Sequence, residues 1–306
     1  MRENVSDKRK YSLWHEIVRN RNNYFMMAGY LICFFIFVIL PVVAAIILSF
    51  TNFNLLQTPQ FTGLGNYLNL FLHDPIFKIS IMNTLVLAAI TGPAGYLLSL
   101  LLAWAINEVT PKIRAFLTLL FYAPSISGGA AYLFTIIFSN DSYGYMNSLL
   151  YSLGLIDTPI QWLSDSKYML WVCVIAQLWM SMGLSFLSFI AGLQGIDKTL
   201  YEAASVDGIR NRYQQLWFIT LPCLKPQLLF GAVTSITGAF TIGDIVTQLF
   251  GNPSNNYAMH TLIQHMQDYG NTRFEMGYAC AIATVLFVLM VVTNLVVQRL
   301  LRKVGS

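Results

Sequence analysis

Two sets of polar residues interrupt an otherwise apolar chain, and neither is suited to making or breaking bonds. One is the charged segment EAASVDGIRNRYQQLWFITLP at 202–222; the other is a series of hydroxyl, amide and carboxyl side chains inside apolar stretches. The sequence has no G-x-x-x-x-G-K-[ST] loop to hold ATP phosphates, no H-E-x-x-H and no Ser/His/Asp spacing. We therefore expect no catalytic residue, and interpret the polar residues as binding and docking groups.

Three polar residues in one apolar stretch recur at the spacing of a helix face. Gln177, Ser181 and Ser185 fall at i, i+4 and i+8, with Trp179 and Met180 beside them. Amide, hydroxyl and aromatic groups in this arrangement can hydrogen-bond and stack on a sugar ring. Helix packing through serine explains the same pattern.

A second line of polar residues follows in the next apolar stretch. It consists of Thr237, Thr241, Asp244 and Gln248, at i, i+4, i+7 and i+11. Polar groups inside a membrane span usually face a cavity or a partner helix. Donors and acceptors in such a line suit sugar hydroxyls and indicate a substrate pathway. Alternatively, Asp244 binds a helix terminus or a lysine in a subunit contact.

The elements that must position these residues are membrane helices. The chain has 306 residues, 56% hydrophobic and 10% charged, whereas soluble domains carry roughly 25% charged residues. Its apolar residues form blocks long enough to cross ~30 Å of hydrocarbon, where a lone segment must be helical. We therefore predict an all-α polytopic membrane protein with six transmembrane helices, at about 24–50, 78–106, 115–139, 169–193, 227–250 and 275–301.

The basic residues predict the orientation. Of 18 Lys and Arg, 15 fall in the N-terminal tail, the second loop, the fourth loop and the C-terminal end. The positive-inside rule places these parts, and hence both termini, in the cytoplasm. We expect a basic cytoplasmic segment at 1–23, whose residues 11–23 form an interfacial helix or simply an anchor, and a tail at 302–306. The net charge of +4 reflects this topology, so nucleic acid is not an expected partner.

Two further features bear on the interior of the membrane. Pro93 beside Gly92, and Pro124 before Gly128 and Gly129, predict kinked or broken helices, typical of transport pathways, or close helix packing. The four cysteines are scattered without a close pair, so we interpret them as small hydrophobic residues and expect no metal site.

The charged segment has the signals of a short, well-bounded helix. Asp197 is a good N-cap, and Ile196 and Tyr201 occupy the positions of a hydrophobic staple. Gly208 is placed to end the helix in a left-handed conformation. Glu202 offers a fixed charge, and the alanines after it a small surface against which a partner could pack closely.

The spacing of this segment resembles a known motif. Glu202-Ala203-Ala204, three residues, Gly208, and then Ile219-x-Leu221-Pro222 resemble the EAA motif of type I ABC importer permeases; Asp207 and the Ile219–Pro222 ending resemble the carbohydrate branch. Ten residues separate Gly208 from Ile219, where the family usually has nine. Asn83-Thr84 and Gly251-Asn252-Pro253 also resemble the family, and the likeness covers roughly 25–301.

The resemblance implies a type I ABC importer permease fold over 24–301, in a bacterial cytoplasmic membrane, with a coupling loop at about 195–222. It implies ATPase contacts by Leu200, Tyr201, Glu202, Ala203, Ala204, Asp207 and Gly208. The implied partners are a second homologous permease, a cytosolic ATPase dimer that binds ATP and Mg²⁺, an extracytoplasmic solute-binding protein and a carbohydrate substrate.

Other functions remain open from the sequence. Within the family, the solute could instead be glycerol phosphate, a polyamine or an amino acid, although few basic residues lie in the spans to bind a phosphate. Outside it, the chain could be an ion-coupled transporter or channel, or a membrane anchor or sensor without transport.

Overall fold

The computed structural model describes residues 20–303, which are helical except for loops and one isolated bridge between Thr51 and Phe61. The helices and helical turns are α2 (Arg21–Phe34), η1 (Phe35–Ile39), α3 (Leu40–Leu48), α4 (Gly65–Leu68), η2 (Asn69–His73), α5 (Pro75–Asn107), α6 (Pro111–Ile126), α7 (Tyr132–Ile137), α8 (Tyr145–Ser152), α9 (Ser166–Met180), α10 (Leu184–Gln194), α11 (Lys198–Val206), α12 (Arg212–Gln215), η3 (Leu216–Thr220), α13 (Leu221–Cys223), α14 (Lys225–Phe240), α15 (Gly243–Phe250), η4 (Asn255–Tyr257), α16 (Leu262–Gln267), η5 (Asp268–Thr272) and α17 (Met276–Lys303).

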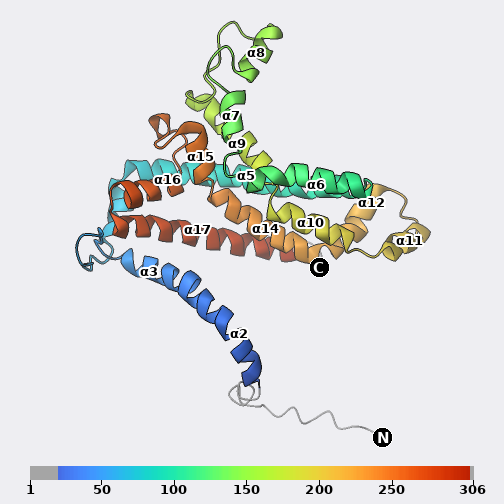
Figure 1. Ribbon diagram of the computed structural model, residues 1–306, viewed down its shortest axis with the longest axis horizontal. Coiled ribbons are helices and arrows are strands. Elements are labelled where there is room, and N and C mark those ends of the chain that lie inside the picture. Colours follow the sequence, from blue (N-terminus) through green and yellow to red (C-terminus); the bar gives the residue numbers. More distant parts are fainter. Residues whose placement is uncertain (1–19, 304–306) are drawn as a thin grey trace.

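An elongated body is built on the long helix α5, which packs against α9, α10 and α14, while α14 packs against α17 (Figure 1). One buried cluster joins α5, α10 and the start of α14 through Leu100, Phe186, Phe189 and Leu224. Gly231 on α14 lies against the Phe189 ring and leaves no room for a Cβ atom. The close approach of α10 and α14 therefore depends on this glycine.

The N-terminal helical segment stands apart from the body. Figure 1 shows α2 leading away from it, with α3 near the start of α17. The segment at 25–48 is the most hydrophobic of the helical segments that could span a membrane. No residue in its most apolar part is buried within the described structure.

The described residues have the predicted all-helical class, while the count of six membrane spans stays a prediction. Three helical segments are long and apolar enough to cross a membrane unbroken, at 25–48, 75–107 and 276–300. Two bent pairs qualify if each is one span: α9 with α10, bent by 41°, and the 212–223 helix with α14, bent by 81°. The block at 115–139 divides into α6 and α7, and the block at 227–250 into α14 and α15.

The prolines act differently in the two places where a kink was expected. Helix α5 continues through Pro93, while α6 ends at Ile126, two residues after Pro124.

The expected amphipathic helix at 11–23 lies mostly, and the C-terminal tail partly, outside the described residues.

A close backbone approach fixes the start of α17, which yields a stability prediction. The Gly277 N–H donates to the Phe53 carbonyl at 2.9 Å, and a Cβ atom at Gly277 would overlap the Thr51 carbonyl. We expect Gly277→Ala to destabilise the protein by about 1–3 kcal/mol through overpacking, seen as a lower thermal unfolding midpoint in detergent. Gly29→Ala is the matched control, since nothing lies within 4 Å of a Cβ there. An equal effect of the two substitutions would contradict this account.

Candidate functional site

The segment at 195–222, called the polar loop from here on, contains the short helix α11. The Asp197 carboxylate accepts a hydrogen bond from the Thr199 N–H at 3.0 Å, which lowers the pKa of Asp197 and keeps the cap ionised. At the other end Gly208 has φ of +92°, and the Ile209 N–H donates to the Ala204 carbonyl at 2.9 Å. This is the Schellman arrangement. The predicted helix start at Asp197 and stop at Gly208 are confirmed.

The residues expected to contact an ATPase differ in exposure. Those on the free surface are Leu200, Glu202, Ala203, Asp207 and Gly208. Ala204 is only 8% exposed, so it packs within the chain and is not part of the small docking surface that the sequence indicated. Val206, 87% exposed, was not singled out and belongs to the free surface of α11.

Tyr201 ties α11 to the segment that returns to the membrane. Its hydroxyl lies 2.9 Å from the Thr220 hydroxyl, which in turn donates to the Gln215 carbonyl at 3.2 Å. Thr220 belongs to the π-helical turn η3, and such a turn closes its hydrogen bond over one more residue than an α-turn. Ile219 and Thr220, in the last two positions of this turn, are buried.

Two adjoining polar cavities lie between the helices on either side of this loop. One, of about 250 Å³, is lined by residues of α5, α9, α10 and α14, including Gln177, Ser181 and Ser185. The other, of about 310 Å³, is lined by Thr241, Asp244 and Gln248 from the α14–α15 region. Gln177, Ser125, Met180 and Gly238 line both, so we treat them together as the polar cavity.

Six of the seven residues predicted for a substrate pathway therefore meet around one space. The exception is Thr237, which lines neither part; its hydroxyl donates to the Val233 carbonyl within α14. The prediction that it continues the polar line is wrong, because the helix breaks at Thr241 and the expected common face does not persist. Sequence reasoning missed Ser125, Ser127 and Thr91; the first two lie in the proline segment already singled out.

Three helix breaks converge on the polar cavity. Ser127 and Gly128 follow α6, Ser181 and Gly183 separate α9 from α10, and Thr241 and Ile242 separate α14 from α15; all these residues line the cavity. The side-chain amide of Gln248 donates to the Gly128 carbonyl at 3.0 Å, which satisfies one backbone group freed by a break. Non-helical backbone at membrane depth is tolerated where it lines such a cavity.

The cavity is rich in hydrogen-bond acceptors and carries a single ionisable group. The amide oxygens of Gln177 and Gln248 are buried without a partner within the described structure. Asp244 is the one carboxylate among the lining residues, and the lining contains no Lys, Arg or His. This arrangement can bind donors such as hydroxyl groups but offers nothing to neutralise an anion. In residues 20–303 no group of three His, Cys, Asp or Glu side chains could hold a metal ion.

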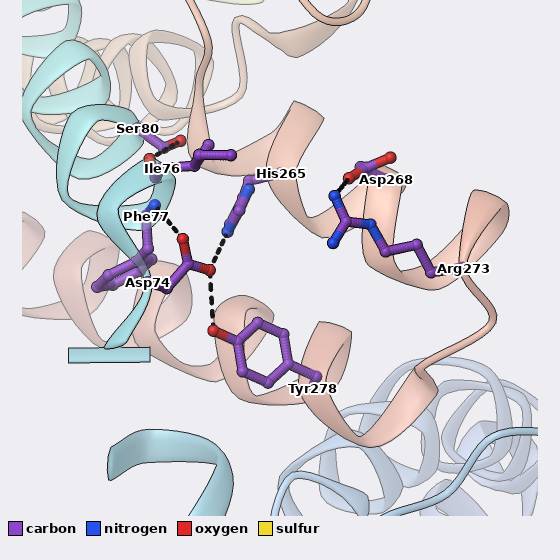
Figure 2. Close-up of polar contacts among 8 residues, drawn as sticks. All are labelled: Asp74, Ile76, Phe77, Ser80, His265, Asp268, Arg273 and Tyr278. Atoms are coloured by element: carbon purple, nitrogen blue, oxygen red, sulfur yellow. Dashed lines mark hydrogen bonds and ion pairs between the residues drawn. The ribbon is translucent and has the colours of Figure 1, made fainter. Parts of the chain in front are cut away.

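At the opposite end of the body from α11, a second polar cluster joins three segments (Figures 1 and 2). Asp74 caps α5 by accepting the Phe77 N–H at 2.9 Å. Its other oxygen lies 2.9 Å from Nε2 of His265 and accepts from the Tyr278 hydroxyl at 2.9 Å (Figure 2). Asp74 is 191 residues from His265 along the chain. No local pattern could have indicated this contact.

Burial controls the protonation of this cluster. It raises the pKa of Asp74, but hydrogen bonds from Phe77, His265 and Tyr278 outweigh it and hold that pKa below its usual value. It lowers the pKa of His265, with partial compensation from Asp74. It also lowers the pKa of His260, helped by His265 and opposed by Asp268 and Asp74, to about 4. Both imidazoles are therefore neutral in the folded protein at neutral pH.

These shifts predict a pH-dependent stability. The unfolded histidines take up a proton near pH 6.5, while the folded ones do so only at lower pH. The unfolded state thus binds more protons in this window, and stability falls as the pH drops from about 7 towards 4. We expect the thermal unfolding midpoint to fall over this range, and the slope to shrink in His260→Gln. A slope in His260→Gln equal to that of the unchanged protein would contradict the assignment.

Comparisons with known proteins agree with this geometry. Residues 95–306 match the family described as "Binding-protein-dependent transport system inner membrane component". The chain is 30% identical over 300 residues to the arabinooligosaccharides transport system permease protein AraP of Bacillus subtilis (strain 168), covering 97% of this chain and 94% of AraP. It is 32% identical over 279 residues to the lactose transport system permease protein LacF of Rhizobium radiobacter, covering 88% and 89%.

A solved structure shares the fold. It is a bacterial alginate ABC transporter in complex with alginate pentasaccharide-bound periplasmic protein, and one of its chains matches with a TM-score of 0.78 and 24% identity over 96% of this chain and 98% of that one. The all-helical ABC permease fold is thus confirmed, and the chain belongs to the family of binding-protein-dependent transport system inner membrane components.

Proposed function

We propose that this chain is a permease subunit of an ATP-driven importer of sugars or oligosaccharides. It forms half of the translocation pathway and couples that pathway to a cytosolic ATPase. The chain itself does no bond chemistry and binds no cofactor; ATP and Mg²⁺ belong to the ATPase.

One observation carries the proposal: the helices that flank α11 also line the polar cavity. Helix α10 contributes Leu184 and Ser185 to the lining and leads into α11 after three residues. The return segment leads through Leu224 into α14, which contributes Thr234 and Gly238. The Tyr201–Thr220 contact joins the two arms below the cavity. A displacement of α11 must therefore move the walls of the cavity.

The proposed topology has six crossings with both termini in the cytoplasm. The three continuous segments and two bent pairs supply five crossings, and α6 with α7 supplies the remaining broken one. The concentration of Lys and Arg in the tail, the second and fourth loops and the C-terminal end supports the orientation. In this proposed orientation α11 lies in the cytoplasm, where an ATPase can reach Leu200, Glu202 and Ala203.

A carbohydrate substrate is supported by the relatives and by the cavity. AraP and LacF are permeases of arabinooligosaccharide and lactose transport systems. A lining with unpaired amide oxygens and without a cation suits hydroxyl donors, and disfavours glycerol phosphate and other phosphorylated solutes. The proposed partners are a second homologous permease, an ATPase dimer and an extracytoplasmic solute-binding protein; the alginate transporter structure contains such a periplasmic protein.

The proposal predicts which proteins accompany the chain when it is purified from its native membrane in mild detergent. We expect a second permease and a P-loop ATPase. Gly208→Asp should lose the ATPase, because Gly208 ends α11 at a positive φ that residues with a Cβ adopt only rarely, and because the substitution adds a carboxylate to the surface that the ATPase would contact. Gly154→Asp is the matched control, since Gly154 also has positive φ and open space around it but lies outside the polar loop.

Two outcomes would contradict the proposal. One is a folded chain that purifies without any ATPase. The other is a complex that keeps its ATPase in Gly208→Asp, with an unfolding midpoint equal to that of the unchanged protein.

A further inference from the structure

A basic cavity of about 700 Å³ lies beside α11, separate from the polar cavity. Its walls come from the end of α5, the start of α6, the end of α10 and the polar loop. Its charged lining residues are Glu108, Arg114, Lys198, Arg210 and Arg212. Four cationic side chains thus face one carboxylate across a space large enough for a small ligand.

Internal contacts use only part of this positive charge. Arg212 forms an ion pair with Glu108. Arg114 donates to the carbonyls of Asn107 and Val109 at the end of α5, at 2.8 and 3.2 Å. Within residues 20–303, no ion-pair partner is found for Lys198 or Arg210, both of which are exposed.

The nearest acidic N-cap residue, Asp197, does not neutralise the excess positive charge of this cavity. The Asp197 carboxylate is directed at the first turn of α11, where it accepts the Thr199 N–H, and it does not line the cavity. Two cations therefore remain available to an incoming anion.

The position of the cavity indicates which anion it meets. Helices α5 and α10, two of the membrane-spanning elements, end at Asn107 and Gln194, and both of these residues line the cavity. The lining also includes Trp104, whose ring lies 6.0 Å from that of Tyr213, and the apolar Leu193. Aromatic residues at the ends of spans are typical of the level of lipid headgroups. Basic pockets between membrane helices at that level bind acidic headgroups.

We propose that this cavity binds a phosphate-bearing anion, and that its source is the headgroup of an anionic phospholipid. Lys198 lies in the first turn of α11 and Arg210 two residues beyond Gly208, so one phosphate between them would bridge both ends of α11. The same ligand would face Arg114 and Arg212, which belong to the α5–α6 corner and the return segment. Lipid binding would thereby hold α11 against the body, which is a regulation of the loop beyond its proposed contact with an ATPase.

The test is native mass spectrometry of the full chain, purified with its companion subunits and delipidated in detergent. Dioleoyl phosphatidylglycerol is titrated against dioleoyl phosphatidylcholine. We expect one phosphatidylglycerol to be retained, and its apparent Kd to rise on the order of tenfold in Lys198→Gln/Arg210→Gln. The matched control is Lys112→Gln/Arg299→Gln, which removes two exposed cations near the same predicted membrane surface but outside the cavity lining. This control should bind like the unchanged protein.

The remaining outcomes test whether a defined site exists and whether its ligand is a lipid. Equal loss of binding in both double variants would show general surface attraction instead of a site. Equal retention of phosphatidylglycerol and phosphatidylcholine would exclude a headgroup charge effect. Displacement of the lipid by millimolar inorganic phosphate would support a phosphate site, whereas phosphate binding without any lipid preference would overturn the lipid source. Unchanged unfolding midpoints ensure that folding does not explain a loss.

Discussion

Backbone N–H and C=O groups cannot be left unpaired against lipid, and the rest of this structure depends on that constraint. The three breaks, after α6, α9 and α14, would each expose such groups if they faced hydrocarbon. They instead gather around one polar cavity, where a side chain such as Gln248 can pair with a freed carbonyl. The breaks in the three helices shape the polar cavity. Its polar lining in turn allows non-helical backbone at membrane depth.

The same constraint links the cavity to the polar loop. Because α10 and α14 line the cavity and continue into the loop, the loop is attached to the cavity walls on both sides. The Asp197 cap, the Gly208 closure and the Tyr201–Thr220 contact make α11 a compact element. In the proposed importer, force applied to α11 reaches the walls through short connections, and the basic cavity offers a second place where that force could be adjusted.

Local features of the fold were predictable from the sequence, and long-range ones were not. The start and stop of α11 follow from Asp197 and Gly208, whose effects act within a few residues. Six of the residues expected in a substrate pathway line the polar cavity, but the breaks at Ser181 and Thr241 interrupt the continuous helical faces that their spacing indicated. Thr237 fails because the break at Thr241 interrupts that face, and Ala204 fails because α11 turns it towards the chain. The Asp74–His265–Tyr278 cluster joins residues about 200 positions apart, which no periodicity encodes.

The central claim, that α11 controls the polar cavity, is tested most directly by measuring which side of the membrane reaches the cavity. In the reconstituted transporter, Ser127→Cys, on a background without the four native cysteines, would be labelled with an impermeant thiol reagent from each side, with and without ATP. The account predicts that ATP switches the labelled side, and that Tyr201→Ala greatly reduces the switch while ATP is still hydrolysed. Labelling that ignores ATP, or a full switch in Tyr201→Ala, would contradict it.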